Sequence, residues 1–270
     1  MSAIQPCALL LLVGPDWQVE AASANVGMLG NARPAGVVGQ PLAELIGSKA
    51  IHSLRNRMSW LSRDESEVQD FGVEWGGVIL DVRATRGSDT YLIEAELAVE
   101  PRLPDGIGMV RSMTDRLAGD DPTDLADQAM RQLTALTGFD RLTLTGRNGD
   151  LLASAGRQLA AGALPGAGET HLQWIIADRE AEAVPMIGQA DAAPISRAAF
   201  LAPGEETQEL LKEHGVCAAM TLPVHIDGER VATLHALHPA PRRCSAERRS
   251  VAHLFAERLA ARMARRGWAF

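Results

Sequence analysis

Residues 211–242 read LKEHGVCAAMTLPVHIDGERVATLHALHPAPR and contain a complete β-hairpin. Two β-prone apolar segments, 218–226 and 230–237, flank Asp227-Gly228, a dipeptide that strongly favours a two-residue turn. Strands joined by so short a turn are antiparallel neighbours in a sheet. The run therefore predicts an antiparallel sheet in the second half of the chain.

Long helices flank this hairpin in the sequence. Thr123 can cap a helix over 123–137, in which apolar residues recur at steps of three and four. A closing helix over 245–266 begins at Ser245 and carries an apolar stripe at steps of four, formed by Val251, Phe255, Leu259 and Met263. We expect further helices at 107–117, 172–182 and 205–214, and further strands at 141–145, 150–155 and 184–188.

The first hundred residues have the pattern of a separate small α+β domain. Apolar strands are expected at 7–13 and 18–22, and three more at 68–75, 78–85 and 91–99 are separated by glycine-containing turns. Short helices are expected between the two groups, at 23–29, 41–47 and 55–61. The Pro- and Gly-containing segment 101–106 marks a domain boundary. The sequence thus predicts an α+β protein with two domains, 1–105 and 106–270, each a central antiparallel sheet flanked by helices.

Composition excludes several classes of protein. The chain has 270 residues, of which 46% are hydrophobic and 22% charged, which is ordinary for a globular protein. A net charge of −8 argues against a general nucleic-acid binder, and no apolar run approaches the length of a membrane span. The three cysteines are too few and too scattered for a disulfide framework, which favours a cytoplasmic location. An excess of 24 Arg over 2 Lys indicates a GC-rich bacterial genome.

No enzyme motif stands out in the sequence. There is no Gly-x-Ser-x-Gly elbow, no phosphate-binding loop and no His-Glu-x-x-His pair. His235 and His238 are three positions apart on an expected strand, so they point to opposite faces and cannot share one ion. We therefore expect a structural role for each of the seven histidines, and neither a metal site nor a catalytic site.

Several segments resemble the PAS–GAF half of a bacteriophytochrome photosensory module. The first, 4–10, is similar to the family's Ile-Gln-Pro-His-Gly-Ala-Leu opening, and 22–25, 39–42 and 136–141 are similar to later segments. The most specific match is 211–242, which aligns without gaps to a family segment that contains Asn-Met-Gly-Val-x-Ala-Ser-Met, then Asp-Gly, then Cys-His-His-x-x-Pro-Arg. The resemblance implies a PAS-like domain at 1–105 and a GAF domain with long flanking helices at 106–270.

The resemblance also implies a bilin, but the residues that would attach it are missing. Bacteriophytochromes attach the bilin through a Cys upstream of the Ile-Gln-Pro motif, and only Met1, Ser2 and Ala3 precede that motif here. We therefore expect neither covalent attachment nor the N-terminal tail that threads the family's figure-of-eight knot. Cys7 falls where the family has the His of the opening motif, and we interpret it as a buried strand thiol.

The positions that would hold the bilin have also changed. Leu201 falls at the position of the propionate-binding Arg, and Thr207 at that of the His beneath the pyrrole ring. Ala219 and Thr221 fall at two hydroxyl positions, and Leu237 at that of the His near the terminal ring. Only Glu169 can imitate the Asp of the family's Asp-Ile-Pro motif. Burying two propionates without the Arg costs several kcal/mol, so the sequence predicts no cofactor.

We therefore expect a non-catalytic sensory or regulatory PAS–GAF protein that has lost bilin binding. Because the sequence ends soon after its last helix, we expect the signal to pass to a separate protein, and a homodimer to form through the helices at 123–137 and 245–266. Two alternatives stay open: a photoreceptor that holds biliverdin non-covalently, and a GAF sensor of another small molecule. In either case the candidate pocket is lined by Leu201, Thr207, Ala219, Thr221, Leu237 and Glu169.

Overall fold

The computed structural model describes the chain except for residues 1–2, 31, 62–66, 158–172, 189–191 and 269–270. The chain divides into two compact units. The first unit combines Met1–Glu100 with Ala181–Ala202, and the second combines Pro101–Glu180 with Pro203–Phe270. The chain therefore passes between the units three times.

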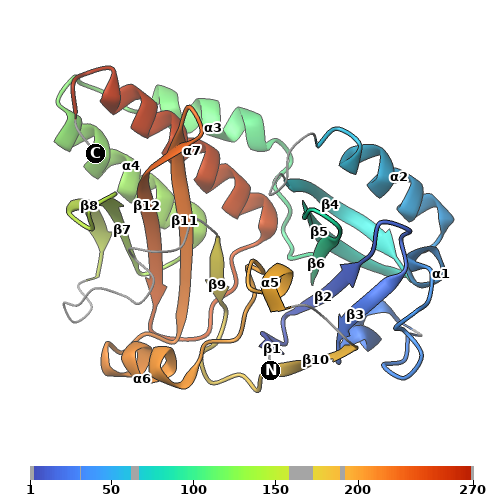
Figure 1. Cartoon of the computed structure of the whole chain (residues 1–270). Helices are drawn as coiled ribbons and strands as arrows, with labels where there is room; N and C mark the ends of the chain where they lie inside the picture. Colours follow the sequence, from blue (N-terminus) through green and yellow to red (C-terminus); the bar gives the residue numbers. More distant parts are fainter. Residues whose placement is uncertain (1–2, 31, 62–66, 158–172, 189–191, 269–270) are drawn as a thin grey trace. The chain divides into compact units, whose positions relative to one another are not determined.

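The first unit is built on a seven-stranded antiparallel sheet (Figure 1). Along the sheet the strands follow the order β1 (Ala3–Ile4), β10 (Val184–Gly188), β3 (Val19–Ser23), β2 (Ala8–Val13), β6 (Tyr91–Leu97), β5 (Val78–Arg86) and β4 (Glu67–Trp75). The helices of this unit are η1 (Val26–Leu29), α1 (Leu42–Ile46), α2 (Ser48–Met58) and α5 (Ala192–Ile195).

The run of apolar residues in β2 reflects burial on both faces of the sheet. Leu9 and Leu11 belong to the main core, which includes residues of η1, α1 and α2. Leu10 and Leu12 point the other way, into a smaller cluster with Ile4. A strand covered on both faces has no polar side to alternate with its apolar side. The strand expected at 7–13 is thus confirmed as β2, and it lies between β3 and β6 in the interior of its sheet.

A segment from the second half of the sequence completes the first unit. Strand β10 pairs with β3 and with β1. Farther along, the buried Glu94 on β6 accepts hydrogen bonds from the backbone N–H groups of Ala199, at 2.7 Å, and Phe200, at 3.2 Å. Its second oxygen lies 2.5 Å from an Arg83 guanidinium nitrogen. This carboxylate therefore joins two strands of the sheet to a segment more than one hundred positions away in sequence.

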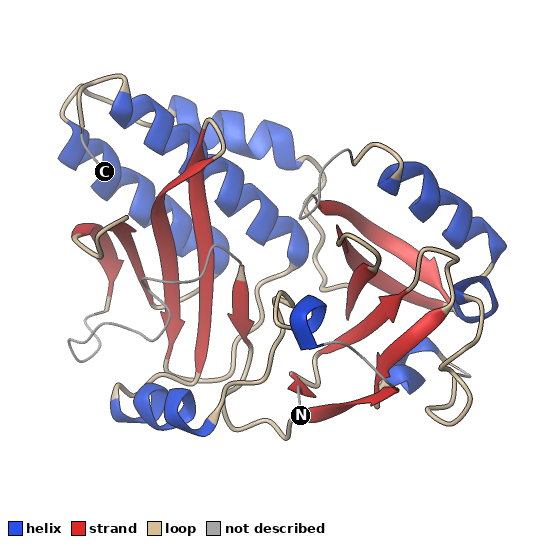
Figure 2. Ribbon diagram, in the orientation of Figure 1, coloured by secondary structure: helices blue, strands red, loops and turns tan. Residues whose placement is uncertain are grey.

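The second unit is a five-stranded antiparallel sheet with helices packed on it (Figure 2). The strand order is β8 (Leu151–Gly156), β7 (Arg141–Gly146), β12 (Glu229–His238), β11 (Ala218–Ile226) and β9 (Trp174–Ile176). Helices α4 (Pro122–Thr137) and α7 (Ala246–Ala264) pack on each other and on the sheet, α3 (Gly106–Asp115) packs on α7, and α6 (Glu205–Glu213) precedes β11.

Both long helices are confirmed, but the cap of α4 differs from the expected one. Asp121, and not Thr123, accepts a hydrogen bond from the backbone N–H of Asp124, so α4 begins at Pro122. Ser245 caps α7 as expected, by accepting a hydrogen bond from the backbone N–H of Arg248. The apolar stripe of α7, including Phe255 and Leu259, is fully buried inside the unit. The helices expected at 107–117, 123–137, 205–214 and 245–266 and the hairpin are thus confirmed. None of the described helices is long and apolar enough to cross a membrane.

Two expected helices are wrong or displaced. The helix expected over 172–182 is absent from the described part of that range, where β9 instead pairs with Ala219–Thr221 of β11. The sequence Trp-Ile-Ile of β9 is strongly β-prone, and pairing with a sheet edge outweighs the local helical pattern. The helix expected at 55–61 is α2, which begins seven residues earlier, directly after Gly47 at φ 89°.

We predict that removing the Glu94 carboxylate destabilises the first unit strongly. Glu94→Ala leaves two buried N–H groups and part of the Arg83 guanidinium without their acceptor, which costs about 3–5 kcal/mol of unfolding free energy. Urea unfolding measures that loss, and amide hydrogen exchange should show faster exchange at Ala199 and Phe200.

The matched control is a surface ion pair. Glu229 lies 3.0 Å from Arg147, but both side chains are more than half exposed, so Glu229→Ala should cost less than about 1 kcal/mol. A loss for Glu94→Ala as small as that of the control would show that Glu94 does not anchor the segment.

Candidate functional site

Three of the predicted pocket residues lie on one face of the second unit's sheet. Side chains alternate along a strand, so Ala219 and Thr221 share a face of β11. In the register of the hairpin, Ala219 pairs with Leu237 and Thr221 pairs with His235 on β12. The structure therefore brings Ala219, Thr221 and Leu237 together and adds His235, which the sequence analysis did not place in the site.

One end of this face is apolar and closely packed. Ala219 and Leu237 form a buried cluster with Ile176 of β9, Leu211 of α6 and Val216, and Trp174 packs against it. The side chains of these neighbours pack around Ala219 and Leu237. The members of this cluster are all apolar, so these side chains offer no charge and no hydroxyl to a ligand.

The other end of the face is polar and also buried. Thr221 and His235 are each only 3% exposed. The Nε2 atom of His235 lies 3.0 Å from the Thr145 hydroxyl on β7, and that hydroxyl lies 3.4 Å from the Thr233 carbonyl. Within the described part of the chain, the His235 Nδ1 and Thr221 Oγ1 atoms have no hydrogen-bond partner. Burying these two polar atoms without hydrogen-bond partners costs folding free energy, and no contact of the described residues offsets that cost.

The environment keeps His235 neutral. Burial lowers the pKa of the imidazole to about 4, and the nearby Arg230 cation acts in the same direction. A neutral imidazole has one N–H donor and one bare acceptor nitrogen. If the Thr145 hydroxyl donates to the Thr233 carbonyl, it accepts from Nε2–H, and Nδ1 is then the bare acceptor.

The other predicted residues do not belong to β11 or β12. Thr207 is a half-buried residue of α6, one turn before Leu211, which belongs to the cluster around Ala219 and Leu237. Leu201 belongs to the first unit, where it forms a bridge with Ile4 and packs against the cluster around Leu10. Glu169 lies outside the described residues.

His238, which matches the second His of the family's pair, has a structural role. Its Nδ1 atom lies 2.7 Å from the Ala240 carbonyl oxygen, and its Nε2 atom lies 3.0 Å from an Arg242 guanidinium nitrogen. The ring also makes an edge contact with Phe139. These contacts hold the turn that follows β12.

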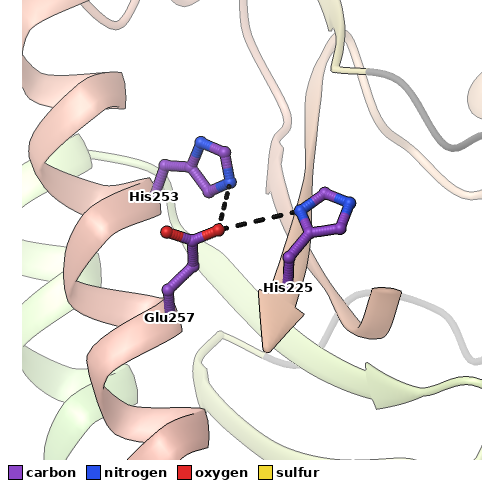
Figure 3. Close-up of side chains that lie close together, drawn as sticks. All are labelled: His225, His253 and Glu257. Carbon is purple, nitrogen blue, oxygen red and sulfur yellow. Dashed lines mark ion pairs between the residues drawn. The ribbon is translucent and has the colours of Figure 1, made fainter. Parts of the chain in front are cut away.

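The sequence analysis missed a cluster formed by His225, His253 and Glu257 (Figure 3). The helical spacing of His253 and Glu257, four positions apart, was the only local signal for it. His225 is 28 positions earlier in the sequence and reaches the pair only because α7 packs on β11.

We predict that His235 makes folding stability fall in acid. The unfolded imidazole takes up a proton near pH 6.5, whereas the folded one does so only near pH 4. Its contribution is therefore fully present above pH 6.5 and is lost as pH falls from 6.5 to 4, by about 3 kcal/mol. Urea unfolding across this range should give a shallower pH dependence for His235→Gln than for the unchanged chain.

Substitution of the exposed His52 by Gln is the matched control for removing an imidazole. Equal pH profiles for His235→Gln and the unchanged chain would contradict the buried neutral state of His235.

Comparison with known families and structures identifies both halves of the chain. Residues 121–263 match the GAF domain family, and residues 1–98 match the PAS fold family. Among curated proteins, none matches this sequence.

Solved structures of phytochromes share the fold. The chromophore-binding domain of a wild-type Stigmatella aurantiaca phytochrome superposes with a TM-score of 0.78 at 20% identity, covering 96% of this chain and 95% of that one. The corresponding domain of an unusual bacteriophytochrome from R. palustris gives 0.75 at 18% identity, covering 98% and 95%. The chain matches 58% of the longer Stigmatella photosensory core module, with a TM-score of 0.77 at 19% identity, over 98% of its own length. The chain therefore belongs to the GAF domain family, with a PAS fold before its GAF domain, and it shares its fold with the chromophore-binding domains of phytochromes.

Proposed function

We propose that this PAS–GAF chain is a non-catalytic regulatory module that has lost bilin binding and acts through a separate protein. The observation that carries the proposal is the buried apolar cluster around Ala219 and Leu237. Two positions that the resemblance assigns to bilin contacts are there engaged in packing with α6 and β9 residues. The similar solved structures are chromophore-binding domains, and the proposal is that this chain kept their fold without that activity.

The chemistry of a bilin supports the same conclusion. Its two propionates are anions and need cations or several hydrogen-bond donors when they are buried. Leu201 stands at the expected arginine position, and its side chain packs against the Ile4 cluster of the first unit. Thr221 retains a hydroxyl, but one hydroxyl does not offset the desolvation of two carboxylates.

A second candidate function is the sensing of a different small molecule. It is favoured by the buried Thr221 Oγ1 and His235 Nδ1 atoms, which lack partners in the described part of the chain. A ligand with a hydroxyl or amide group could hydrogen-bond to both atoms. Native mass spectrometry of the purified protein separates the two candidates, because a co-purifying metabolite favours the sensor and its absence favours the regulatory module.

We propose that the chain is a homodimer and that it acts on its partner in the cytoplasm. None of the three cysteines, all of which the structure describes, forms a disulfide, as is usual in a reducing compartment. Although the apolar stripe of α7 is buried within the unit, Leu254 on the same helix is 41% exposed. This residue is available to a helix-to-helix contact between two copies.

We predict that biliverdin does not bind as a chromophore. Titration of the purified protein with biliverdin should leave the absorbance spectrum of the free pigment unchanged, and red or far-red light should cause no conversion. The Stigmatella aurantiaca chromophore-binding domain, treated in the same way, is the positive control. A sharpened red band that photoconverts would overturn the proposed loss of bilin binding.

We predict that the chain is a dimer in solution and that Leu254→Asp dissociates it. A charge at this position would be buried in the proposed helix contact without a partner. Size-exclusion chromatography with light scattering measures the mass of both proteins. Trp60→Asp, which replaces an even more exposed apolar residue on the first unit, is the control and should remain dimeric. A monomeric mass for the unchanged chain would contradict the dimer.

A further inference from the structure

We propose that His225, His253 and Glu257 form a zinc-binding site that links α7 to the β11–β12 hairpin of the GAF unit (Figure 3). The site uses none of the residues matched to bilin contacts. A negative zinc test would therefore leave the proposed regulatory function unaffected, and a bilin-binding result would leave the zinc site unaffected.

The two helical ligands are positioned by the geometry of α7. His253 and Glu257 are four positions apart, so their side chains lie one turn above the other on the same face. Helix α7 packs on β11, and this face is directed at the end of that strand (Figure 3). The two ligands are thus presented together by a rigid element.

The third ligand lies beside an irregularity of the hairpin. The register of β11 and β12 shifts between Val224 and His225, where Val231 of β12 is the extra residue. Strict alternation would place His225 on the same face as Ala219 and Thr221, away from α7. A bulge increases the local twist of both strands, and beside it the His225 Nδ1 atom lies 3.7 Å from Glu257 Oε1. The end of the hairpin thus brings the third ligand to α7.

The interatomic distances are close to those of a tetrahedral zinc site. Glu257 Oε1 lies 3.4 Å from His253 Nε2 and 3.7 Å from His225 Nδ1. Zinc bonds of about 2.0–2.2 Å at tetrahedral angles place neighbouring ligand atoms about 3.3–3.6 Å apart. All three ligand atoms lie within 4.8 Å of one another, so small rotations of the imidazoles complete the geometry.

The surroundings of the His253 imidazole also favour the binding of a cation. Its buried Nε2 atom lies 3.4 Å from Glu257 Oε1, which is longer than the usual hydrogen-bond distance of about 2.7–3.2 Å. A metal ion between the two would accept the nitrogen lone pair and neutralise the carboxylate. The three side chains are each about one-third exposed, so an ion can enter from solvent and keep a water as its fourth ligand.

The ligand set selects the metal. Two imidazoles and one carboxylate suit zinc, whereas calcium and magnesium prefer sites built from oxygen atoms. A simpler interpretation is that His225 and His253 each form an ion pair with Glu257 when their imidazoles are protonated. Metal titration distinguishes the two, because ion pairs alone give no saturable binding of zinc.

The test is a titration of tag-free, EDTA-treated and dialysed full chain with zinc chloride by isothermal calorimetry. We expect saturation at one zinc per chain. Cobalt(II) should give the visible absorption bands of a four-coordinate ion, and zinc should displace it. Zinc should also raise the Tm, because binding to the folded state alone stabilises it.

Two single substitutions and two controls locate the site. His225→Gln and His253→Gln should each weaken zinc binding by at least about tenfold and remove the Tm shift. His52→Gln, on α2 of the first unit, controls for histidine content, and Cys7→Ser controls for binding by a thiol. Both controls should bind zinc as the unchanged chain does.

Several outcomes would overturn the proposal. They are the absence of saturable zinc binding in the unchanged chain, zinc binding that survives both His225→Gln and His253→Gln, and binding that is lost in either control. Because all three ligands are partly exposed, we expect the variants to fold, and far-UV circular dichroism checks this. Should one histidine variant fail to fold, the other and Glu257→Gln still decide the result.

Discussion

The carboxylate of Glu94 is the buried ionic contact that, together with the pairing of β10 with β1 and β3, joins two distant parts of the chain into one unit. A buried carboxylate is costly unless it is paired and hydrogen-bonded, and Glu94 meets both conditions with Arg83 and two backbone N–H groups. Since those N–H groups belong to Ala199 and Phe200, the anchor fixes the end of the segment that supplies β10. It also fixes Leu201, the next residue, in its bridge with Ile4. The position matched to a propionate-binding arginine is thus held by the packing of the first unit.

Local sequence patterns predicted most elements of the fold, but not the long-range course of the chain. The apolar run of β2, the turn at Asp227-Gly228 and the capped helices each depend on neighbouring residues, and all are observed. The placement of β10 in the first sheet depends on pairing with β3, about 165 positions away in sequence, which no local pattern can specify. Strand β9 was missed for the same reason, because its conformation is set by pairing with β11.

The candidate site was predictable to the extent that it follows from alternation along a regular strand. Ala219 and Thr221 share a face by alternation along β11, but their pairing with Leu237 and His235 depends on the extra residue Val231 in β12, because the two-residue turn alone would pair Ala219 with Ala236. Neither the position of His235 opposite Thr221 nor its burial could therefore be known without the structure. His225 was unpredictable because alternation along β11 assigns it to the face of Ala219, whereas its Nδ1 atom lies 3.7 Å from Glu257 Oε1 on α7.

Strand β11 connects the two sites of the GAF unit. It carries Thr221 on the face shared with His235 and, four residues later, directs His225 at α7. Protein interiors are close-packed, so a ligand that moves Thr221 and His235 must also shift the strand that holds His225. If both sites are used, each ligand changes the affinity for the other by the same factor, since coupling between binding sites is reciprocal. A module without a bilin would then still have a physical route from its sheet to α7, the helix proposed to contact a second copy.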